Sequence, residues 1–141
     1  MAGKKSFESN AVFIELILSI LFFSLAAAIC VRIFVGANQI SNRSINVGNA
    51  VIEAENFAEC FKGTNGDIEE VVLMNDAEVV DGRLIMYYDA DWNKCDGDLA
   101  QFVLEMSPIS EGSVNYADIT VKDMNDNMLF DITAALLKEV S

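Results

Sequence analysis

The sequence contains no histidine, a single proline and few cations. The absence of histidine removes the commonest general base at neutral pH and the commonest ligand of transition metals. A glycine-rich phosphate loop and a zinc-like cysteine spacing are missing as well. We therefore expect a protein that is not an enzyme and that carries no cofactor.

The 141 residues include nine Lys and Arg against 22 Asp and Glu, which gives a formal net charge of −13. The excess lies in residues 36–141, where six Lys and Arg stand against 20 Asp and Glu, a net charge of −14. Nucleic-acid binding depends on clustered cations that neutralise phosphates, and the only adjacent pair is Lys4-Lys5. Nucleic acid is therefore excluded as a partner.

Residues 11–35 are strongly apolar and contain only two charged residues, Glu15 and Arg32. The part from Ala11 to Val31 is long enough to cross the membrane, since a helix needs ~20 residues to cross about 30 Å of hydrocarbon. Lys4 and Lys5 precede it, and the positive-inside rule then places the N-terminus in the cytoplasm. The sequence predicts a single-pass protein of the cell membrane, in contact with lipid, with a cytoplasmic leader at 1–10 and an extracytoplasmic C-terminal domain.

A cleaved secretory signal is the main alternative, with cleavage after the small residues Ala26-Ala27-Ala28. Two features count against it. The apolar stretch exceeds the usual ~7–15 residues of a signal peptide, and it contains Glu15. An unpaired charge inside a membrane costs free energy, so ionisable residues there usually have a function. We therefore expect Glu15 to be a functional residue with a partner of opposite charge.

The run Val12-Phe13-Ile14-Glu15-Leu16 resembles the N-terminus of type IV pilins and pseudopilins, which show Phe-Thr-Leu-Ile-Glu-Leu there. By that resemblance, Glu15 corresponds to the glutamate at the fifth mature position, which pairs with the free amino terminus of a neighbouring subunit. The resemblance implies a structural subunit, a minor pilin or pseudopilin, of a bacterial type IV pilus or type II secretion-like assembly. Its implied partners are other pilin-like subunits, prepilin peptidase and the assembly machinery.

Asn10 departs from that family, because prepilin peptidases want Gly at the residue before the mature start, which would be Ala11. The chain keeps the glutamate and lacks the glycine. The alternative function is a membrane-tethered extracytoplasmic binding domain that does not polymerise.

Residues 36–62 are expected to extend the membrane helix as an amphipathic helix that ends near Gly63. Residues spaced by alternating steps of four and three share one face of it. The alternatives are two helices joined by a flexible stretch at 36–46, or a coiled-coil dimer. The predicted stripe consists of Ile40, Ser44, Val47, Val51, Ala54, Ala58 and Phe61.

Residues 67–141 are expected to form an antiparallel β domain. The stretch 67–74 suits either a short helix or a strand, and an Asp81-Gly82 turn indicates a hairpin between 78–80 and 83–88. A helix with an apolar stripe and a four-stranded sheet would each cover the other's apolar face. The predicted fold is α+β and pilin-like, and its further strand-like runs are 100–107, 114–122 and 128–137.

Two small sites are also suggested. Cys60 and Cys95 lie outside the membrane stretch and could form a disulfide, the alternative being two free thiols. The loop from Asp89 to Asp98 has oxygen ligands at alternate positions, as calcium loops do, although Lys94 replaces the expected Gly. The candidate metal ligands are Asp89, Asp91, Asn93 and Asp96, and the alternative is a solvated acidic loop.

Overall fold

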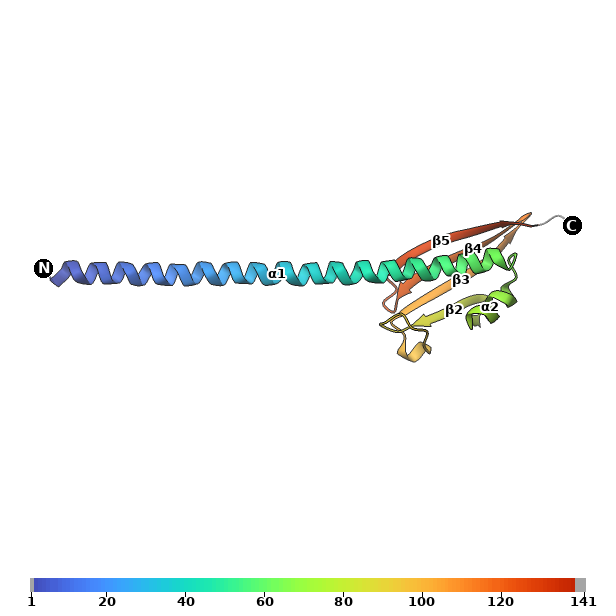
Figure 1. Ribbon diagram of the computed structural model, residues 1–141, viewed down its shortest axis with the longest axis horizontal. Coiled ribbons are helices and arrows are strands. Elements are labelled where there is room, and N and C mark those ends of the chain that lie inside the picture. The colour runs from blue at the N-terminus through green and yellow to red at the C-terminus, as the bar shows by residue number, and fades with distance from the viewer. Residues whose placement is uncertain (1, 139–141) are drawn as a thin grey trace. The chain divides into compact units, whose positions relative to one another are not determined.

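The computed structural model describes residues 2–138 (Figure 1). Met1 of the predicted leader and residues 139–141 of the predicted β domain lie outside the described residues. The chain divides into two compact units, one ending at Arg43 and one starting at Ser44. The elements are α1 (Ala2–Gly63), α2 (Ile68–Asn75), β1 (Glu78–Val80), β2 (Arg83–Tyr88), a 3-10 turn (Gly97–Leu99), β3 (Phe102–Glu111), β4 (Val114–Asp123) and β5 (Met128–Leu137).

The first unit consists of the N-terminal part of α1. This helix begins at Ala2, so the described part of the predicted leader is helical as well. The stretch 36–46, where a break was the alternative, is helical throughout. Alpha1 is also the one helix in residues 2–138 that is long and apolar enough to cross a membrane.

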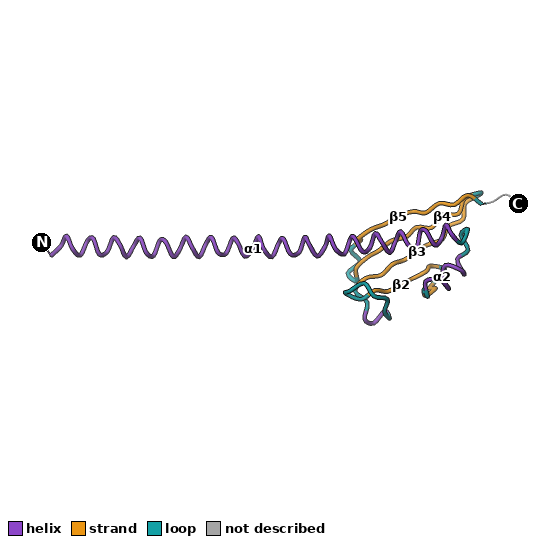
Figure 2. The backbone as a smooth tube through the Cα atoms, viewed as in Figure 1, coloured by secondary structure: helices purple, strands orange, loops and turns teal. Residues whose placement is uncertain are grey.

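The second unit is a five-stranded antiparallel sheet with the C-terminal part of α1 lying across one face (Figure 2). The strands follow the order β1-β2-β3-β4-β5, which confirms the predicted α+β fold and the meander. The sheet has five strands, one more than the four expected, and β1 pairs with β2 from Glu78 opposite Ile85 to Val80 opposite Arg83, which confirms the predicted hairpin.

Strand β3 is longer than predicted and continues through Pro108 to Glu111. Proline has no N–H to donate and is confined to sheet edges and bulges. Strand β2 pairs with β3 only as far as Met106, so β3 is an edge strand where Pro108 lies. The proline is therefore tolerated instead of ending the strand.

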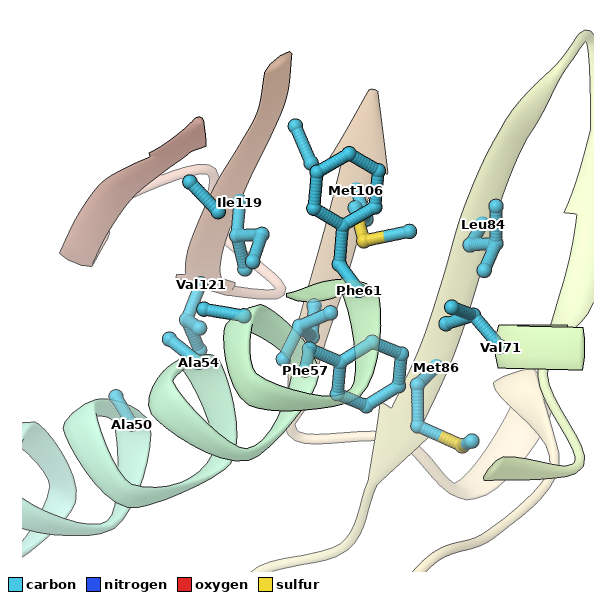
Figure 3. Packing of buried hydrophobic residues seen from close by; sticks show 14 of the residues in the cluster. Ala50, Ala54, Phe57, Phe61, Val71, Leu84, Met86, Met106, Ile119 and Val121 are labelled. Atoms are coloured by element: carbon cyan, nitrogen blue, oxygen red, sulfur yellow. The ribbon is translucent and has the colours of Figure 1, made fainter. Parts of the chain in front are cut away.

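The core lies between the C-terminal part of α1 and the sheet (Figure 3). The predicted stripe is right for Ala54, Ala58 and Phe61, which are all buried. It is wrong for Ile40 and Ser44, which are exposed. It also missed Ala50 and Phe57, because a helix lying on a sheet buries a wider face than a single heptad seam.

Local signals set the turns around this core. Asp67 caps α2, since its carboxylate accepts the N–H groups of Glu69 at 3.0 Å and Glu70 at 3.3 Å. The stretch 67–74, which suits either a helix or a strand by sequence, is therefore a helix from Ile68 onward. Asp81 and Gly82 both have positive φ, 51° and 78°, as expected for the predicted hairpin turn.

Candidate functional site

Glu15 lies in the apolar part of α1, and its side chain is exposed. In a helix, its neighbours one turn away are Ala11 and Val12 on one side and Leu18 and Ser19 on the other. None of these is a cation. Within the described side chains, no Lys or Arg comes within ion-pair distance of the Glu15 carboxylate.

The two serines of this apolar stretch, Ser19 and Ser24, form hydrogen bonds within the helix. Ser19 Oγ donates to the backbone oxygen of Glu15 at 2.9 Å. Ser24 Oγ donates in the same way to the backbone oxygen of Ile20, also at 2.9 Å. Such bonds to the preceding turn let serine lie in an apolar environment without unpaired polar groups. Between residues 11 and 31, Glu15 is the one charged side chain, and the described chain offers it no ion-pair partner.

Cys60 and Cys95 are both half-buried free thiols in the structure. Cys60 borders a groove of about 660 Å³ between α1 and α2, whereas Cys95 borders a separate pocket of about 320 Å³ beside β2. Lys94 lines both cavities and donates through Nζ to the backbone oxygen of Asn75 at 2.7 Å. The Cys95 thiol has a raised pKa, mainly because of burial and further because of the nearby carboxylates of Asp89 and Asp96. Its thiolate is thus disfavoured.

The acidic loop from Asp89 is closed by its own hydrogen bonds. The Asp89 carboxylate accepts the backbone N–H groups of Asp91 and Asn93, each at 2.9 Å. These bonds, that from Asn93 foremost, lower the pKa of Asp89. No set of three or more Cys, Asp or Glu side chains is placed to hold a metal ion in the residues that the structure describes.

A second loop repeats this arrangement and was missed from the sequence. Asp123 accepts the backbone N–H groups of Asn125 at 2.8 Å and Asn127 at 2.9 Å, and its other oxygen accepts from the Asn127 side chain at 2.8 Å. The shared signal is Asp followed by polar residues two and four positions later. Alternate oxygen-bearing residues in this protein therefore close loops, a role that short Asx turns commonly have.

Two side-chain hydrogen bonds join α1 to the end of β2 and to the loop that follows it. Trp92 packs with a ring stacked on Phe102, with centroids 4.3 Å apart, and its indole N–H donates to Asn46 Oδ1 at 3.2 Å. Tyr88 donates its hydroxyl to a carboxylate oxygen of Glu53 at 2.9 Å. Trp92 has a positive φ of 63°, a conformation unusual for a bulky residue, which these contacts hold in place.

No family model, no curated protein and no solved structure matches this chain. The class is therefore defined by the structure alone. It is an α+β protein with a long N-terminal helix that could span a membrane and with a small acidic domain built on an antiparallel sheet.

Proposed function

We propose that this protein is a pilin-like structural subunit, a minor pilin or pseudopilin, whose N-terminal helix assembles with the helices of like subunits. The observation that carries this proposal is Glu15. It is a carboxylate in the otherwise apolar, exposed stretch of α1 from residue 11 to residue 31, and the described chain offers it no partner. Leaving such a charge unpaired in lipid costs several kcal/mol by most estimates.

The partner is then supplied by a second chain, and the amino terminus of a neighbouring subunit has the required positive charge. The serines of this stretch cannot be the missing partner of Glu15, because the hydroxyls of Ser19 and Ser24 already donate hydrogen bonds to backbone oxygens of the helix. Small residues also favour close packing between helices. Those in this stretch are Ser19, Ser24, Ala26, Ala27 and Ala28.

In this proposal the N-terminus is cytoplasmic and the acidic domain extracytoplasmic. The positive-inside rule supports this orientation, since Lys4 and Lys5 closely precede the apolar stretch. Processing would occur between Asn10 and Ala11. Mass spectrometry of the N-terminus checks this point, because an N-methylated start at Ala11 is the product expected from pilin maturation.

The decisive experiment replaces Glu15 by Gln, which has nearly the same shape and no charge. We expect Glu15→Gln to remain inserted in the membrane and to lose crosslinks between subunits. Ser19→Ala, one turn away, is the matched control and should keep them. If Glu15→Gln crosslinks as well as the native chain, the subunit proposal is wrong and the tethered, non-polymerising binding domain takes its place.

A further inference from the structure

Strand β5 forms one edge of the sheet, and within residues 2–138 no strand pairs with its free side. A sheet edge presents a row of backbone N–H and C=O groups that can pair with another strand. The other edges are short or blocked. Strand β1 has only three residues, and the part of β3 beyond Met106, which β2 does not cover, contains Pro108. Strand β5, with ten residues, is the long open edge.

Strand β5 also lacks the charges that usually protect an edge from pairing. Asp131 is its only charged residue, although residues 44–141 carry 20 Asp and Glu against five Lys and Arg. On the side of the sheet that α1 covers, Phe130, Ile132 and Leu136 are only half-buried. An added strand would cover these apolar side chains.

We propose that β5 pairs antiparallel with β5 of a second copy of this chain, about a two-fold axis at Thr133. The strand's own sequence favours this occupant. In that register Phe130 lies opposite Leu136 of the second copy and Ile132 opposite Ala134, so that each larger apolar side chain meets another apolar side chain.

The other side of the sheet agrees with the same register. Asp131 lies opposite Ala135 of the second copy, and Thr133 lies opposite its own equivalent. No like charges face each other. An axis at Asp131 would instead place two carboxylates directly opposite, which is unfavourable.

A cavity at the end of β5 selects the Thr133 axis over its neighbours. This cavity has a volume of about 370 Å³ and is bordered by Asn65, Asn115 and Leu136. Asn115 and Leu136 are paired residues on the side of the sheet that α1 covers. Phe130 of the second copy lies opposite Leu136 at this cavity, and the two-fold symmetry places a second ring in the equivalent cavity. Buried aromatic side chains in such pockets are the usual anchors of an interface.

The contact is small, so it should be weak in dilute solution. Both domains are strongly acidic, and salt should therefore strengthen the pairing by screening their repulsion. The inference goes beyond the proposed function, because it uses residues 128–137 and does not depend on Glu15.

The test changes the charge of Ala135, which faces Asp131 of the second copy in the proposed register. The full-length chain is measured in detergent micelles by analytical ultracentrifugation. Ala135→Glu should raise the dimer Kd and Ala135→Lys should lower it, each by roughly 2- to 30-fold, because two symmetric pairs change at once. Val80→Glu and Val80→Lys are the matched controls, since Val80 is exposed on the opposite edge strand.

Each variant is also measured in the Glu15→Gln background, so that association through the N-terminal helix does not contribute to the measured dimer Kd. Opposite shifts for the two Ala135 variants, with smaller shifts for the Val80 controls, support the pairing. Equal shifts at both positions, or a native chain that is monomeric at every concentration once Glu15 is replaced, overturn it. Crosslinking through the helix that remains sensitive to Glu15 would then leave the proposed function standing.

Discussion

The Tyr88 hydroxyl donates a hydrogen bond of 2.9 Å to a Glu53 carboxylate oxygen and so joins β2 to α1. Tyr88 is among the largest fully buried side chains, with 1% of its surface exposed. Burial, then the charge of Glu53 and the hydrogen bond itself, raises the pKa of Tyr88 far above its ordinary value. A bond to a charged acceptor in this position fixes how α1 lies along the sheet from residue 44 onward.

The first prediction concerns the strength of this bond. Tyr88→Phe and Glu53→Ala should each destabilise the domain, and their coupling energy in a double-mutant cycle should be about 1.5–3 kcal/mol, the range for hydrogen bonds to charged groups. Thermal unfolding of the full chain, followed by circular dichroism, measures it. Tyr87→Phe, one residue away on the other face of β2, should have little effect. A coupling energy near zero would show that the bond contributes nothing to stability.

The second prediction concerns alkaline pH. The folded state keeps the Tyr88 phenol neutral, whereas the unfolded chain ionises it at its ordinary pKa of 10.0. The stability contributed by the neutral phenol is thus complete below about pH 10 and is lost as the pH rises further. Native protein should lose stability above pH 10 more steeply than Tyr88→Phe. Equal slopes for the two proteins would contradict the raised pKa.

The third prediction concerns the helix face that the sequence pattern missed. Phe57 is 1% exposed against the sheet, so Phe57→Ala should destabilise the domain by about 3–5 kcal/mol. Ile52 is 55% exposed on the same helix, and Ile52→Ala should change stability by at most ~0.5 kcal/mol. Chemical unfolding of both variants gives the comparison. Similar losses would mean that α1 packs through a different face.

The fourth prediction concerns the two Asp-closed loops. Hydrogen bonds to the ionised carboxylates lower the pKa values of Asp89 and Asp123 below the ordinary 3.8. Their contribution to stability is therefore present above pH 3.8 and is lost as the pH falls through the lowered pKa values. Asp89→Asn and Asp123→Asn should each flatten the acid side of the stability curve.

Calcium provides an independent check on these loops. If their oxygens serve to close the chain, added Ca²⁺ should leave Tm unchanged in the native protein and in both Asn variants, as Mg²⁺ should. A rise in Tm with Ca²⁺ that disappears in Asp89→Asn would instead support the metal site suggested by the alternation of oxygen ligands.

Much of the fold follows from signals that act within a few residues. The continuous helix through residues 36–46 and the Asp81-Gly82 turn depend on neighbouring backbone groups, and both are where the sequence placed them. All five strands lie on runs that the sequence predicted, although the expected count of four strands was one too few. The sequence predicts an end of β3 at residue 107, before Pro108, whereas the strand continues to Glu111 because its pairing with β2 stops at Met106.

The sequence by itself determined that an apolar helix with one carboxylate, Glu15, precedes an acidic α+β domain, because hydropathy and charge are properties of the residues alone. Only the tertiary structure decided which partners meet across long distances in the chain. Tyr88 and Glu53 are 35 residues apart, and Trp92 and Asn46 are 46 apart. No local pattern encodes such pairs, since they form only when α1 and the sheet bury their apolar faces against each other. The open edge of β5 arises in the same way, from the order in which the strands pair.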